Sequence, residues 1–100
     1  MSRYLVTYHG SGMPDDPAVM EQAKAAFGKW LGEAGSAIVD PGAPVHTVGQ
    51  VSSGSPTGPV EIGGYSIIEA DSPEGAAAVL QGHPFVARGG TLQVNQILEV

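Results

Sequence analysis

The sequence predicts an α+β domain of the ferredoxin-like kind, a split βαβ arrangement in which two helices cover one face of an antiparallel sheet. Several short segments alternate apolar and polar residues, as strands do. Two other segments have apolar residues at helical spacing, each behind a capping side chain and a proline. The segments follow one another as strand, helix, paired strands, helix and strand, the order of that fold. The chain has 100 residues, and we expect residues 1–100 to form a single domain.

The first strand and the first helix have clear limits. Residues 3–8, RYLVTY, are β-branched and aromatic, which is typical of a strand. Asp16 followed by Pro17 is a helix start, because the carboxylate caps free amides and proline already has a helical φ. Apolar residues then recur every three or four positions as far as Ala34. Gly35 suits the left-handed conformation that closes a helix.

The middle of the chain is predicted to contain three strands. We expect a short strand over 36–40, a proline-glycine turn over 41–44 and a second strand over 45–51. The polar segment 52–59 resembles a hairpin loop. Residues 63–70, GGYSIIEA, are expected to form a central strand.

The last part of the chain repeats the helix-start signal. Ser72 and Pro73 precede an alanine-rich helix that we expect to end at Gly82. The segment 91–100 alternates and is predicted to form the final strand.

Composition excludes several classes of function. The net charge is −6, with ten acidic residues against four scattered lysines and arginines, so no basic patch is present for nucleic acid or an anionic membrane. The absence of cysteine excludes disulfides, thiolate nucleophiles and cysteine metal sites. No apolar run approaches ~18 residues, and the first residues lack the pattern of a signal peptide. We therefore expect a cytoplasmic protein.

Three segments together resemble the YCII-related domain, most closely its DGPF-type branch. They are YLVTYHG, WLGEAGSAIVDPGAP and GGYSIIEADSPEGAAAVLQGHPFVARGGTLQVNQILEV, and they cover nearly the whole chain. The resemblance implies a dimeric α+β barrel, in which the sheets of two copies pack face to face. The strand over 63–70 independently favours such a homodimer, because it has apolar residues on both faces, and two helices can cover only one.

Some members of that family resemble enzymes with a His–Asp pair and dehydrochlorinase-type chemistry. The histidine lies on the first helix and the aspartate just before the proline after the second helix. This chain has Ala23 or Lys24 near the first position and His83, before Pro84, at the second. The pair therefore does not transfer. The resemblance implies only the location of a functional site, which is a cleft near the end of the second helix.

His83 is the strongest candidate for chemistry. Imidazole titrates near physiological pH, so His83 is a candidate general acid or base, and Asp40, Asp71 or Glu69 is a candidate orienting carboxylate. The alternative is local. Pro84 forces the preceding residue out of the helical region, and a histidine there can bond a carbonyl at the end of a helix.

Other side chains are candidates for ligand contact rather than catalysis. Tyr8 and Tyr65 are expected to face one cleft, with His9 at the end of the first strand and Glu69 nearby as further ligand-binding candidates. The three histidines show no metal-binding spacing, and no nucleotide or nucleophile motif is present, so neither metal nor cofactor is predicted.

Two classes of function remain open at this level. The first is a non-catalytic, YCII-like dimeric module that binds a small organic molecule in a cleft near the end of the second helix, or that assists a partner protein. The second is a small acid–base enzyme, lyase-like or dehydrochlorinase-like, that uses His83 and a carboxylate.

Overall fold

The computed structural model describes residues 1–10 and 16–99 of the chain. Within these residues four strands form one sheet, and the elements in chain order are β1 (Ser2–His9), α1 (Pro17–Ala34), β2 (Ile38–Pro44), β3 (Gly64–Ala70), α2 (Pro73–Leu80), α3 (Pro84–Ala87) and β4 (Thr91–Gln96). The sheet order is β2-β3-β1-β4, and every neighbouring pair is antiparallel. This is the predicted ferredoxin-like arrangement.

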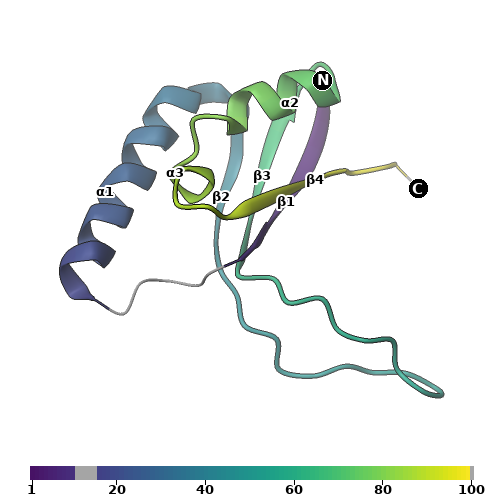
Figure 1. The fold of residues 1–100 in the computed structure, drawn as a ribbon. Coiled ribbons are helices and arrows are strands. Elements are labelled where there is room, and N and C mark those ends of the chain that lie inside the picture. Colours follow the sequence, from purple (N-terminus) through teal and green to yellow (C-terminus); the bar gives the residue numbers. More distant parts are fainter. Residues whose placement is uncertain (11–15, 100) are drawn as a thin grey trace.

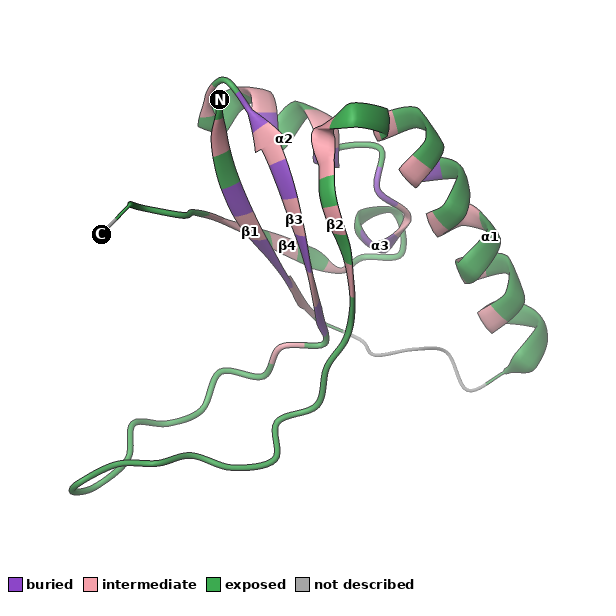
Figure 2. Ribbon diagram, turned by 180° about the vertical axis from the view of Figure 1, so that it is seen from behind, coloured by how far each residue is buried: buried purple, intermediate pink, exposed green. Residues whose placement is uncertain are grey.

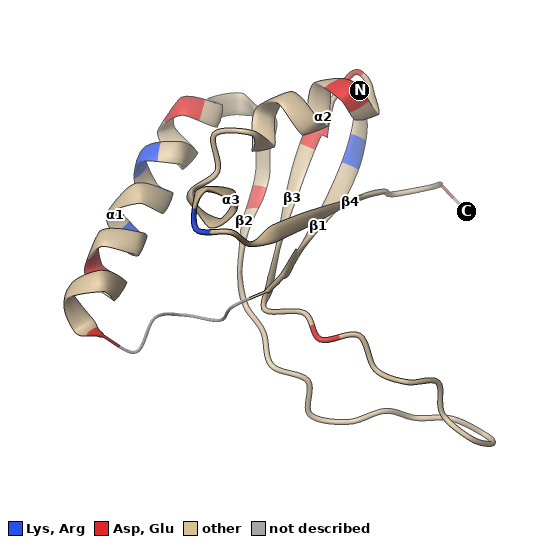
Figure 3. Ribbon diagram, in the orientation of Figure 1, with Lys and Arg blue, Asp and Glu red and all other residues tan. Residues whose placement is uncertain are grey.

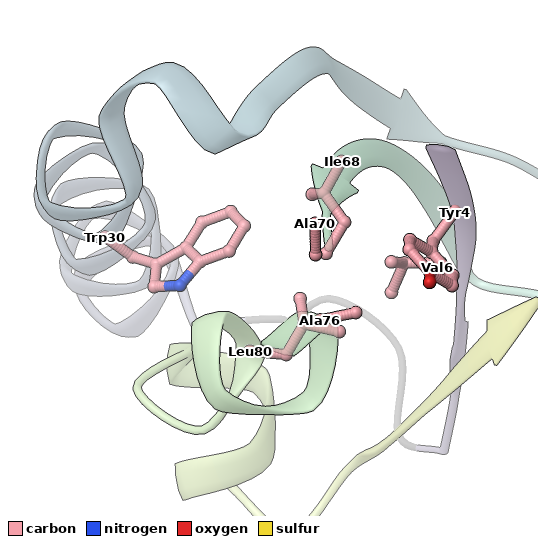
Figure 4. Packing of buried hydrophobic residues seen from close by; sticks show 7 residues of the cluster. All are labelled: Tyr4, Val6, Trp30, Ile68, Ala70, Ala76 and Leu80. Atoms are coloured by element: carbon pink, nitrogen blue, oxygen red, sulfur yellow. The ribbon is translucent and has the colours of Figure 1, made fainter. Parts of the chain in front are cut away.

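The helices lie on one side of the sheet, as Figure 1 shows. Strand pairing places Tyr4 opposite Ile68 and Val6 opposite Ser66, so these side chains share a face. All four are almost completely buried, which identifies their face as the one beneath the helices. The core consists of the buried residues Tyr4, Val6, Trp30, Ile68, Ala70, Ala76 and Leu80 (Figure 4).

Trp30 ties the long helix to the rest of the core. It is the one buried residue of α1, only 3% exposed, and its indole nitrogen donates a hydrogen bond of 3.1 Å to the carbonyl oxygen of Val79 in α2. A buried indole N–H needs such a partner. The contact therefore fixes α1 against α2 as well as against the sheet.

Both helix starts form as the sequence predicts. The Asp16 carboxylate accepts a hydrogen bond of 2.9 Å from the amide of Ala18, and the Ser72 hydroxyl accepts one of 3.0 Å from the amide of Gly75. At the end of α1, Gly35 has a φ of 55°, and its amide donates to the carbonyl of Leu31.

The region between α1 and β3 differs from the prediction. One irregular strand, β2, replaces the expected strand 36–40 and the turn 41–44. Pro41 has no amide to donate, and the Asp40 carboxylate accepts a bond of 2.8 Å from the amide of Gly42, so the strand bulges there and still pairs with β3.

The expected strand over 45–51 does not form. The pairing of β2 with β3 ends where the amide of Val45 donates to the carbonyl of Gly63. Beyond this point the chain leaves the sheet as a long arm (Figures 1 and 2). Val48 and Val51 on this arm are 93% and 103% exposed. An alternating pattern makes a strand only where a second strand supplies partners.

Two smaller differences concern the end of the chain. A short helix, α3, follows α2 and was not predicted. The last strand ends at Gln96 rather than continuing over 91–100, although the amide of Ile97 still bonds to the carbonyl of Arg3. The expected loop after β1 falls partly on residues 11–15, which lie outside the described residues. No described helix combines the length and apolar character needed to cross a membrane.

Candidate functional site

The segment QGHPFVARGGT, residues 81–91, forms a tight junction between α2 and β4. The His83 amide bonds to the carbonyl of Leu80, and the His83 side chain caps the next helix, where its Nδ1 accepts a hydrogen bond of 3.0 Å from the amide of Phe85. Gly89 has a φ of 90°, which favours glycine. Gly90 leaves room for the Phe85 ring, since a Cβ there would overlap it. The side chain of His83 therefore caps the start of α3, whereas only its backbone amide meets the end of α2.

His83 is also the first member of a buried hydrogen-bond chain. Its Nδ1 accepts from an amide, so in the neutral ring the proton lies on Nε2, which donates to the Tyr8 hydroxyl over 2.8 Å. The Ser66 hydroxyl donates to the carbonyl oxygen of Pro41 over 2.9 Å, because a carbonyl can only accept. Tyr8 then donates to Ser66 over 2.8 Å. Every proton in the chain is thereby assigned.

Burial keeps both titratable members of this hydrogen-bond chain, His83 and Tyr8, neutral. His83 is 2% exposed, and desolvation, with a smaller contribution from the Arg88 cation, lowers the pKa of its imidazole to about 4. Desolvation also raises the pKa of the Tyr8 phenol, partly opposed by the hydrogen bond to Ser66. At neutral pH the site therefore presents an uncharged imidazole and an uncharged phenol.

The three candidate carboxylates lie elsewhere. Asp40 caps the bulge of β2, Glu69 forms an ion pair with Arg3 at 3.3 Å, and Asp71 is exposed after β3. None of the three is bonded to His83, whose ring nitrogens are occupied by Phe85 and Tyr8. The expected His–carboxylate pair is thus not formed, because the amide of Phe85 bonds to Nδ1 of His83 and the phenol of Tyr8 bonds to Nε2.

The two tyrosines expected in one cleft lie on opposite faces of the sheet. Tyr8 pairs with Gly64, so Tyr65 pairs with Thr7 on the other face. His9 is on that other face too, and its Nε2 lies 2.8 Å from the Thr7 hydroxyl. Of the ligand-binding candidates, Tyr8 alone has its side chain on the helix side with His83.

A cavity of about 310 Å³ lies beside this chain, between α1, α3 and the adjoining ends of β2 and β3. Its lining is mostly apolar, with two cations and the two neutral polar groups. It is lined by Tyr8, Ala23, Lys24, Phe27, Pro41, Gly42, Ala43, Pro44, Gly63, Gly64, Tyr65, His83, Pro84, Phe85 and Arg88. Tyr65 belongs to this lining although strand alternation directs its side chain to the other face.

Lys24 and Arg88 were not singled out as site residues from the sequence. Lys24 lies three positions before Phe27, the spacing of neighbours on one helix face, and this was the available signal. Arg88 gave no signal, because the short helix that places it was not predicted. Within residues 1–10 and 16–99, no three His, Cys, Asp or Glu side chains gather closely enough to hold a metal ion.

Comparison of the chain with models of known protein families, with curated proteins and with solved structures gives no match. The resemblance to the YCII-related domain stays a prediction from the sequence.

Proposed function

We propose that this protein binds a small organic molecule in the cavity between α1, α3 and the sheet. The observation that carries the proposal is the composition of that cavity, in which apolar walls surround a few convergent polar groups. Sites for small molecules commonly have this composition, and about 300 Å³ is the lower end of their usual size. A compact ligand of one ring with a substituent is the appropriate scale.

The supporting walls are well held in place. Phe27 comes from α1, next to the buried Trp30, with ring centroids 5.8 Å apart. Phe85 lies against Tyr8, with centroids 5.2 Å apart, and packs over Gly90. Rings fixed in this way supply apolar contact without a large loss of side-chain freedom when a ligand binds.

The acid–base alternative has less support. A general base needs a pKa near the working pH and a free lone pair, whereas the His83 pKa is lowered to about 4 and its Nδ1 lone pair accepts an amide. The arrangement therefore gives the cavity an uncharged polar wall and does not favour transfer of a proton.

The test is a fragment screen by amide NMR on the wild-type chain and two variants. Ala23→Leu places extra carbon atoms in the cavity from α1, and Ala25→Leu adds the same atoms to the same helix at an exposed position outside the lining. We expect fragments to shift amides around the cavity in the wild type and Ala25→Leu, and to lose this effect in Ala23→Leu. Equal binding by both variants, or shifts confined to other surfaces, would contradict the proposal.

We also infer that the uncovered face of the sheet pairs with a second copy of the chain. The middle of that face has Leu5 opposite Ile67 and Thr7 opposite Tyr65, two uncharged rows of which three side chains are half-buried. A chain of net charge −6 repels its own copies, so a neutral face is the favourable place for them to meet.

A further inference from the structure

We infer that the ligand of this cavity is a compact organic anion, with an apolar ring as its body and a carboxylate or similar anionic head group. This inference rests on the proposed binding function and adds the chemical class of the ligand. It comes from the distribution of charge around the cavity, which differs from that of the chain as a whole.

The cavity gathers positive charge in an acidic protein. The chain has only four lysines and arginines against ten acids, yet two of those four, Lys24 and Arg88, line the cavity. No acidic side chain is among the described residues that line it. The two cations come from separate elements, α1 and the end of α3, where basic residues are blue in Figure 3. Two positive charges in the lining, with no acidic side chain among its described residues, favour an anionic ligand over a neutral or cationic one.

Neither cation is neutralised by a described carboxylate. Across residues 1–10 and 16–99 the ion pair that forms joins Arg3 to Glu69, away from the cavity. The Arg88 guanidinium lies over the Phe85 ring, 5.7 Å from its centroid. Stacking on an aromatic ring orients a guanidinium and leaves its N–H groups available for hydrogen bonds in the plane. Arg88 is therefore suited to bind a planar carboxylate through hydrogen bonds from its guanidinium.

The rest of the lining fits the body of such a molecule. Phe27, Phe85 and the two prolines of β2 provide flat apolar surfaces for a ring. The His83–Tyr8 pair adds polarity without charge, since all of its protons are committed to neighbours. An anionic head group is thus directed to Lys24 and Arg88, and the uncharged ring to the remaining walls.

Three probes of nearly equal shape test the charge of the head group. Benzoate, benzamide and benzylamine are titrated into the wild-type chain at low and high salt, with amide NMR shifts giving the dissociation constants. We expect benzoate to bind about tenfold more tightly than benzamide, the effect of one charge-assisted hydrogen bond, and to weaken with salt. Benzylamine should bind most weakly. Phenyl phosphate distinguishes a phosphate from a carboxylate preference.

Variants assign the effect to residues. Lys24→Gln and Arg88→Gln each remove one cavity cation, and Lys29→Gln removes the same charge from the same helix outside the lining. We expect each of the first two to weaken benzoate about tenfold and to leave benzamide unchanged. Lys29→Gln should leave both unchanged. Unchanged unfolding midpoints establish that all three variants fold.

The outcomes separate this inference from the binding function itself. Benzamide and benzoate binding equally at the cavity would overturn the anion inference and leave the binding function standing. The anion inference would also be overturned if Lys29→Gln weakened benzoate binding as much as Lys24→Gln does. The weakening would then come from the net charge of the chain and not from the cations of the cavity. No cavity shifts with any probe or fragment would overturn both.

Discussion

The imidazole of His83 donates its Nε2 proton to the hydroxyl of Tyr8 across 2.8 Å, although the two residues are 75 positions apart in the chain. The bond joins the turn after α2 to the second-last residue of β1. The amide of Phe85 sets the tautomer of the histidine, and the carbonyl of Pro41 sets the proton direction at the other end of the hydrogen-bond chain. The bond to Tyr8 joins these two ends and gives one wall of the cavity its polarity.

The first prediction concerns the pH dependence of stability. The folded pKa of His83 is lowered to about 4 from 6.5, so the unfolded state takes up the proton first as the pH falls. The stability that the neutral His83 contributes to the folded state is fully present above pH 6.5 and is lost as the pH falls to about 4. The loss in the free energy of unfolding amounts to roughly 3 kcal/mol in total. Urea unfolding of wild type and His83→Asn at pH 7, 5.5 and 4 measures it. Asparagine also caps helices but does not titrate, so it should lack this part of the decrease.

The same state of His83 is visible directly. Nitrogen-detected NMR of the imidazole should show a protonated Nε2 and an unprotonated Nδ1 throughout pH 5.5–8. Titration of the ring near pH 6.5 would contradict both the tautomer and the pKa.

The second prediction concerns the phenol. Tyr8→Phe removes the acceptor of the His83 N–H and leaves that buried donor without a partner, so we expect a loss of about 1–3 kcal/mol in the free energy of unfolding. Tyr65→Phe is the matched control, because within the described chain the Tyr65 hydroxyl makes no hydrogen bond; its effect should stay within ~0.5 kcal/mol. Denaturant unfolding at pH 7 compares them. Similar losses in both would mean that the hydrogen-bond chain does not contribute to stability.

The third prediction contrasts two glycines. Gly42 has a φ of 76° in the bulge of β2, and a Cβ there would overlap the carbonyl oxygen of Tyr65, so Gly42→Ala should destabilise the fold by about 3 kcal/mol or more. Gly28 lies within α1 with open space around it, and Gly28→Ala should stabilise by about 0.5–1 kcal/mol. Thermal unfolding of both variants gives the comparison. A tolerated alanine at position 42 would mean that β2 does not bulge as described.

The fourth prediction concerns assembly. If two copies pair through the open sheet face, light scattering at micromolar concentration should give about twice the chain mass of 10.2 kDa. Ile67→Lys places a charge in the middle of that face and should shift the mass to a monomer, whereas Val19→Lys on the outer part of α1 should not. A monodisperse wild-type monomer would rule out the face-to-face barrel.

The sequence by itself determined the strands β1, β3 and β4 and the starts of α1 and α2. These depend on local chemistry, namely capping oxygens, proline and two-residue alternation, so residues close in the chain carry the signal. Trp30 could be assigned to the core for the same reason, from helical spacing.

Tertiary structure alone decided the site. The role of His83 depends on Tyr8, which the antiparallel register brings beside it, and no local pattern encodes a partner 75 residues away. The register also directs the side chains of Tyr8 and Tyr65 to opposite faces of the sheet, although both residues belong to the lining of the cavity. Asp40, Glu69 and Asp71 have no bond to the histidine. Lys24 and Arg88 share a cavity only because α1 and α3 pack together over the sheet. The type of each element depends mainly on residues close in the chain, whereas strand pairing and helix packing depend on the whole chain. For this reason the elements were more predictable from the sequence than the chemistry of the cavity.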